Sequence, residues 1–135
     1  MGLSYIWDTN AIVHYLQRRY PSSGEEFINK VALNHQPVIS VITEIELLCW
    51  KTAAESDIVV LNNFISNSVI YELDQNIKLK TIEIRRKFKL KLPDAIIAAS
   101  ALVNNHILIT NNLIDFNKVA KLKMIDPFAL ISHKG

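Results

Sequence analysis

Short apolar runs alternate with longer amphipathic stretches along the whole chain, and this alternation restricts the possible folds more than any other feature. Strands that are covered on both faces read as short continuous apolar runs, and parallel neighbours need a crossover helix between them. We expect strands at residues 3–7, 38–40, 69–71, 106–109 and 123–125, the last at an edge. We expect helices at residues 11–16, 25–35, 41–51, 56–65, 74–88 and 92–103, the last being the clearest. The pattern predicts an α/β domain with a parallel sheet of four to five strands and helices on both faces.

The composition indicates one folded domain over residues 1–135, with a peripheral tail from about residue 127. Half of the residues are hydrophobic, and the net charge of +2 is too small to indicate nucleic-acid binding by itself. Cys49 is the only cysteine, so we expect a reducing compartment and interpret Cys49 as a small core residue. No signal peptide is evident, and no apolar run approaches the ~20 residues of a membrane span, so we expect a cytoplasmic protein.

Acidic and amide side chains follow the predicted strands. Asp8 ends the first strand, Glu46 lies in the helix after the second, and Asp94 opens the helix at 92–103. Asn112 and Asp115 follow the fourth strand. The carboxyl ends of parallel strands meet at one edge, which is where such sheets bind ligands. We therefore expect these side chains to lie close together.

Each of these residues also has a purely structural explanation. Asp8, Asn112 and Asp115 would serve as helix caps, and Thr43 with Glu46 matches a capping box. A carboxylate such as Asp94 in a first helical turn gains roughly 0.3–1 kcal/mol from the helix dipole. Taken singly, these explanations are favoured. Taken together, they require several unrelated caps on one edge of one sheet.

A carboxylate cluster would need a cation, because neighbouring acids repel one another and their pKa values rise otherwise. Oxygen ligands suit Mg²⁺ or Mn²⁺, and such an ion can activate water and polarise a phosphodiester. The chain has only three glycines, too few for a glycine-rich phosphate loop. The histidines lack metal-ligand spacing and are interpreted as surface or loop residues: His14, His35, His106 and His133.

Two helices invite more detailed predictions. In the helix at 41–51, the apolar stripe is expected to hold Ile42, Ile45 and Cys49, with Glu46 among them. A bare carboxylate buried there would be costly unless something pairs with it. In the helix at 25–35, Ser23 is the candidate cap.

Four segments resemble, in order and spacing, the four motifs of PIN-domain ribonucleases, and most of all those of VapC toxins of type II toxin–antitoxin pairs. They are Asp8-Thr9-Asn10, Ser40-Val-Ile-Thr-Glu-Ile-Glu-Leu47, Leu92-Pro-Asp-Ala-Ile-Ile-Ala98 and Thr110-Asn-Asn-Leu-Ile-Asp-Phe116. The resemblance implies a PIN-like three-layer α/β/α sandwich. It also implies a metal held by Asp8, Glu46 and Asp94, with Glu44 as the alternative to Glu46. Asn112 stands where many relatives have Asp, so Asp115 is a candidate for the missing charge, and we expect one metal ion at rest.

The same resemblance implies a metal-dependent endoribonuclease that cleaves single-stranded RNA, a cognate antitoxin as partner, and a homodimer. Thr9, Asn10 and Thr110 are then candidates to hold the waters of the metal. The basic run before Asp94 could follow the RNA backbone, or simply be a solvated helix end: Arg85, Arg86, Lys87, Lys89 and Lys91.

Three other readings stay open at this point. A non-catalytic PIN-like domain would bind RNA or a protein. A phosphatase would use Asp8 as nucleophile, although the dehalogenase-like phosphatases have Asp-x-Asp where this chain has Asp8-Thr9-Asn10. A structural domain would use the acids only as caps.

Overall fold

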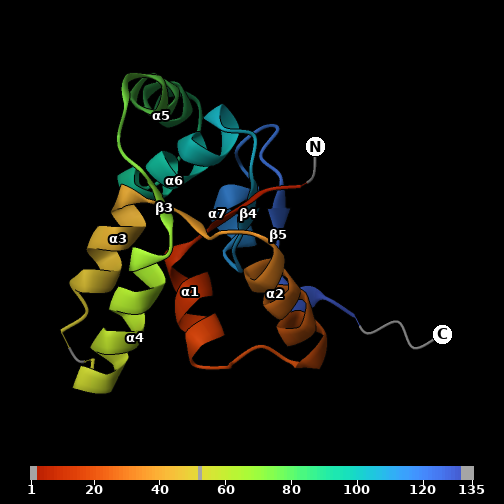
Figure 1. Cartoon of the computed structure of the whole chain (residues 1–135). Coiled ribbons are helices and arrows are strands. Elements are labelled where there is room, and N and C mark those ends of the chain that lie inside the picture. The colour runs from red at the N-terminus through yellow and green to blue at the C-terminus, as the bar shows by residue number, and fades with distance from the viewer. Residues whose placement is uncertain (1–2, 52, 132–135) are drawn as a thin grey trace.

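The computed structural model describes residues 3–51 and 53–131 (Figure 1). Five strands alternate with helices as predicted. The strands are β1 (Tyr5–Trp7), β2 (Val38–Ser40), β3 (Val69–Tyr71), β4 (Ile107–Ile109) and β5 (Met124–Ile125). The helices are α1 (Thr9–Leu16), α2 (Ser22–Asn34), α3 (Val41–Leu48), α4 (Glu55–Ser66), α5 (Gln75–Lys87), α6 (Leu92–Val103), α7 (Leu113–Phe116) and the short 3-10 helix η1 (Pro127–Ala129).

All strand pairs in the described residues are parallel. The hydrogen-bonded order is β1-β4-β5 in one ladder and β2-β3 in the other, and β1 lies beside β2. In register, Trp7 stands opposite Ile109, and Ser40 stands opposite Tyr71. The strands therefore end together, which brings the residues that follow β1, β2 and β4 to one edge.

Successive strand residues point to opposite faces, and each face is covered by its own set of helices. Ile6, Val38 and Leu108 belong to a core shared with α5, α6 and α7. Trp7, Ile39 and Ile109 belong to a second core shared with α1, α2, α3 and α4. This is the three-layer α/β/α sandwich that the resemblance implied.

Helix α6 is the best-predicted element and the most enclosed one. Its bounds match the prediction, and every residue from 95 to 101 is buried. Four alanines in that stretch keep the helix thin, so the sheet and α5 both approach it closely. Figure 1 shows α5 and α6 side by side.

The buried face of α3 differs from the predicted stripe. Thr43 and Leu47 are buried, whereas Ile45, Glu46 and Cys49 are exposed, so the prediction of Cys49 as a core residue is wrong. The helix contacts α1 and α6 on different sides, and these two neighbours decide which residues turn inward. The capping box from Thr43 to Glu46 does not form, because α3 already begins at Val41 with the Ser40 hydroxyl as its cap.

Two further local predictions need correction. Helix α2 begins at Ser22 after Pro21, so Ser23 lies inside the first turn and is not the cap. His14 lies half-buried within α1 rather than on the surface or in a loop. His35 and His106 do lie in connections, and His106 lies within hydrogen-bonding distance of Ser4 Oγ and Tyr71 Oη. His133 is outside the described residues. None of the helices in the described part of the chain is long and apolar enough to cross a membrane.

Helix α2 packs against η1 at Gly24. A Cβ built on Gly24 would lie 2.1 Å from the carbonyl oxygen of Pro127, and Pro127 itself is buried. This backbone approach needs the missing side chain. The contact fastens the segment after β5 to the α2 side of the sandwich.

We predict that Gly24→Ala destabilises the protein by about 1–3 kcal/mol, because the methyl group forces α2 and η1 apart. The gain in helix propensity, about 1 kcal/mol, offsets only part of this loss. Urea denaturation measures the effect, with Ser22→Ala at an exposed position of the same turn as the control. A Gly24→Ala protein more stable than the wild type would show that the close approach is absent in solution.

Candidate active site

Asp8 is the buried centre of the candidate site. It follows β1 directly, is only 6% exposed, and its backbone N–H donates to the carbonyl of Ile109 on β4. Its Oδ1 accepts from the Thr9 backbone N–H at 2.8 Å, and its Oδ2 accepts from Thr110 Oγ1 at 2.8 Å. Asp8 therefore does cap α1, as the structural explanation proposed, and one of its oxygens is also bound by the residue that follows β4.

Glu46 reaches the same edge from α3. Thr9 Oγ1 donates to Glu46 Oε1 at 2.6 Å and lies 3.1 Å from the hydroxyl of Thr43. Thr43 is fully buried, so its hydroxyl is a fixed partner for the Thr9 hydroxyl. The hydrogen bond places Glu46, rather than Glu44, beside the residue that follows Asp8. Thr43 belongs to the segment at 40–47 but was not predicted as a site residue. Its inward orientation depends on how α3 packs, which the sequence does not reveal.

Asp94 and Asp115 form the other side of the site. Asp94 lies half-buried in the first turn of α6, and Asp115 lies in α7. The Asn112 amide donates to Asp115 Oδ2 at 3.2 Å, and the Asn112 backbone N–H donates to Thr110 Oγ1 at 3.0 Å. Asn112 thus holds Asp115, and Thr110 links this pair to Asp8. Asn10, also predicted near the site, is exposed.

The charges of these acids act on one another. The pKa of Asp8 is raised to about 6, mainly by burial and to a smaller extent by the charges of Asp94 and Glu46, while two hydrogen bonds act in the opposite direction. Burial also raises the pKa of Asp94, followed by the charges of Asp115 and Glu46, while Lys91 lowers it. Asp8, Glu46 and Asp94 are therefore near enough to influence one another electrostatically. Among the described residues, Asp8, Glu46 and Asp94 have no ion pair with a basic side chain.

The donor set fits a hard divalent cation. In this side-chain arrangement, no three acids or other ligands within residues 3–51 and 53–131 are grouped closely enough to hold one ion together. That is compatible with Mg²⁺, which usually takes one or two protein carboxylates and completes its shell with water and substrate phosphate. Glu46 is exposed and can turn, whereas Asp8 is fixed.

We predict that Asp8→Asn stabilises the metal-free protein at neutral pH. The folded protein keeps the Asp8 proton up to about pH 6, whereas the unfolded chain releases it near 3.8. The carboxyl therefore costs stability progressively as the pH rises from 4 to 6, in total about 3 kcal/mol. Urea denaturation in EDTA should give a gain at pH 7.5 that vanishes at pH 4. Exposed Glu72→Gln is the control, and a pH-independent difference would contradict the assignment.

A parallel α/β/α sandwich with a buried aspartate at the carboxyl edge of its sheet, and further acids near it, defines the class of domain. The sequence model of the PIN domain family matches residues 5–122, and the chain belongs to this family.

Solved structures of toxin–antitoxin complexes share the fold. A chain in DNA-bound VapBC from Salmonella typhimurium is 25% identical, with a TM-score of 0.78, over 93% of this chain and 99% of that chain. A chain in a toxin–antitoxin complex from Klebsiella pneumoniae is 27% identical, with a TM-score of 0.73, over 94% and 100%. A chain in VapBC-1 from nontypeable Haemophilus influenzae is 24% identical, with a TM-score of 0.75, over 93% and 98%. A comparison with curated protein sequences gave no match.

Proposed function

We propose that this protein is a Mg²⁺- or Mn²⁺-dependent endoribonuclease that cleaves single-stranded RNA, and that it is the toxin of a VapBC-type pair. One observation carries the proposal: buried Asp8 shares its edge with Glu46 and Asp94, and no described basic side chain pairs with any of the three. Burial makes the ionised forms of Asp8 and Asp94 costly, so a divalent cation and its phosphate substrate are a natural counterpart for this group of acids.

Each acid has its own role in this proposal. Asp8 is the rigid ligand, because hydrogen bonds hold both of its oxygens. Glu46 is the adjustable ligand, held only by the Thr9 hydroxyl. Asp94 is half-buried, and the charges of Asp115 and Glu46 raise its pKa. A divalent ion bound there would supply water activation and neutralise charge on the phosphate. Thr9 and Thr110 keep the carboxylates oriented.

Asn112, at the fourth motif, is proposed to act by orienting Asp115. Asn112 holds Asp115 by its amide, so Asp115 contributes negative charge near Asp94. With an amide in place of a carboxylate, the site has too little negative charge for a second ion in the absence of substrate.

We predict that the RNA-free protein binds one Mn²⁺ ion, and that Asn112→Asp adds a second, weaker binding event. Isothermal titration calorimetry measures both stoichiometries. Asn117→Asp, an exposed amide just beyond the same helix, is the control for added charge. Two equivalent ions on the wild-type protein would contradict the role given to Asn112.

An antitoxin partner is part of the proposal. The related chains come from toxin–antitoxin complexes. On this chain, α3 and α4 lie side by side, as Figure 1 shows. Both helices also carry exposed apolar side chains. They include Ile45, Leu48, Ile58, Val59 and Val60, which are 43–59% exposed. An apolar surface of this kind suits the apolar face of a partner helix. The homodimer stays a prediction, which light scattering can test.

The non-catalytic alternative leaves the acids unexplained, since a domain that only binds RNA or protein has no use for a buried carboxylate with a raised pKa. The phosphatase alternative requires Asp8 as an exposed nucleophile. Asp8 is buried, with both oxygens bound by neighbours, which makes in-line attack on a phosphate unfavourable.

We predict that the purified protein cleaves single-stranded RNA only with Mg²⁺ or Mn²⁺, and that Asp94→Asn lowers the rate at least a hundredfold, as losses of groups that act on the transition state do. EDTA should abolish the cleavage. Asp74→Asn is the matched control, because Asp74 only caps α5 and Asn caps a helix equally well.

Cleavage that survives Asp94→Asn would exclude Asp94 as a site residue. A folded wild-type protein, free of any copurified inhibitor, that cleaves no RNA with either metal would favour the non-catalytic alternative. An acid-stable phosphate on Asp8 would favour the phosphatase.

A further inference from the structure

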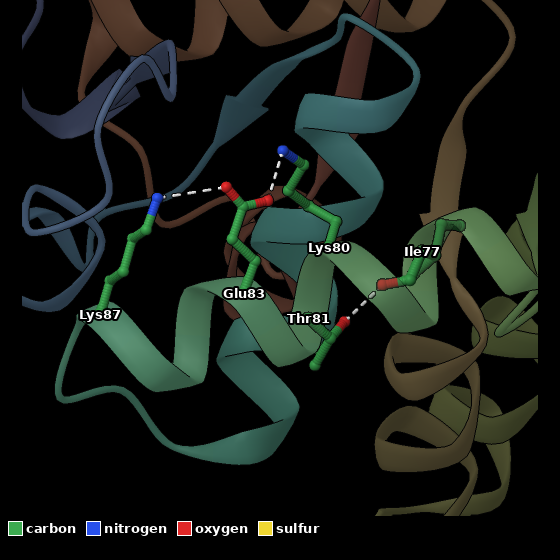
Figure 2. Close-up of polar contacts among 5 residues, drawn as sticks. All are labelled: Ile77, Lys80, Thr81, Glu83 and Lys87. Carbon is green, nitrogen blue, oxygen red and sulfur yellow. Dashed lines mark hydrogen bonds and ion pairs between the residues drawn. The ribbon is translucent and has the colours of Figure 1, made fainter.

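The basic run that leads to Asp94 is divided by its ion pairs. On α5, Glu83 Oε2 lies 2.8 Å from Lys80 Nζ, and Glu83 Oε1 lies 3.3 Å from Lys87 Nζ, as Figure 2 shows. One carboxylate thus partly neutralises two lysines. Both lysines line a cavity that also contains Lys121 and Leu102. This part of α5 presents a mixed surface rather than an unbalanced positive one.

Three other cations of the run gather elsewhere, whereas Arg86 lines neither of the two cavities. Arg85, Lys89 and Lys91 line a separate cavity of about 600 Å³, and Lys118 enters it from the end of α7. Among the described residues, Arg85, Lys89 and Lys91 take part in no ion pair. The cavity therefore holds four cations against one acid, Asp115. We call it the cationic cavity.

The cationic cavity adjoins the proposed active site. Lys118 Nζ lies 3.7 Å from Asp115 Oδ1 and donates to the backbone carbonyl of Lys89 at 3.4 Å. Asp115 in turn raises the pKa of Asp94, and Lys91 lowers it. Asp115 thus stands between the acids and the cations. Lys91 and Leu92, which line the cavity, directly precede Pro93 and Asp94 in the sequence, so the cavity begins next to the proposed site.

We propose that the cationic cavity binds a backbone phosphate of the single-stranded RNA beside the scissile bond. This inference rests on the proposed nuclease function and adds where the substrate is held. Arg85, Lys89 and Lys91 are exposed and lack an ion pair among the described residues, so an anion bound between them and Lys118 would be attracted by several unpaired positive charges. The cavity also contains Leu90 and Leu92, of which Leu92 is 52% exposed, and such a side chain suits contact with a ribose or base.

Lys118 is the new member of this RNA-binding set. It lies well beyond the run at 85–91 in sequence, and only the fold brings it to Lys89. Arg85 is the counterpart on α5. These two residues approach the cavity from different elements, so together they test the cavity rather than one helix.

The test measures binding separately from cleavage. A labelled, mixed-sequence single-stranded RNA is titrated in EDTA with Asp94→Asn protein, over a range of salt concentrations. Each lost phosphate contact lowers the slope of log K against log salt by about 0.7. We expect Arg85→Gln/Lys118→Gln to lower this slope by about 0.7, because one phosphate contact is lost. Lys80→Gln/Lys121→Gln removes the same charge from the other cavity and should lower the slope far less.

Equal slope losses in the two double variants would overturn the proposal, since only net charge would then matter. Unchanged binding in Arg85→Gln/Lys118→Gln would overturn it as well. The same selective loss for duplex DNA or an acidic peptide, bound more tightly than RNA, would assign the cavity to that ligand instead. If RNA binding follows the expected slopes while native protein cleaves nothing, the cavity stands and the nuclease proposal fails alone.

Discussion

The hydrogen bond from Thr110 to the Asp8 carboxylate is the interaction on which the organisation of the site depends. It joins the ends of β1 and β4 across 102 residues of sequence, inside a layer that excludes water. Because the carboxylate is buried, it must be held in one orientation. The neighbouring contacts depend on this orientation. The Asp8 carboxylate also accepts from the Thr9 backbone N–H, and the Thr9 hydroxyl donates to Glu46. The Thr110 hydroxyl in turn accepts from the Asn112 backbone N–H.

The local pattern of apolar residues was sufficient to predict the strands, the helices and their arrangement in layers. The apolar runs at β1, β2 and β4 have no polar face to suggest an open sheet, so helices on both sides were required. The alanines of α6 marked a helix enclosed on several sides. Asp8 and Asp94 were predictable because their positions depend only on where a strand ends or a helix begins, and parallel strands align those ends.

The features that the sequence did not predict depend on how a helix is rotated about its axis and on where long side chains reach. Apolar spacing in α3 placed Cys49 inward, but contacts with α1 and α6 turn Thr43 inward instead. Lys118 gives no local signal, since a lone lysine after a short helix is normally solvated. Whether Lys87 is available to an anion depends on Glu83, and four residues of helical spacing permit that pair without requiring it.

The long sequence separation between Asp8 and Thr110 also affects when the site can form as the protein is made. Domains are synthesised from the N-terminus, and this one cannot close its first strand against β4 until residue 109 has left the ribosome. Glu46 and Asp8 emerge early, but the residues that fix and complete the acid cluster emerge in the last third of the chain. A nascent chain therefore carries Asp8 and Glu46 before the contacts that position them can form. The assembled site appears only when synthesis of the domain is nearly complete.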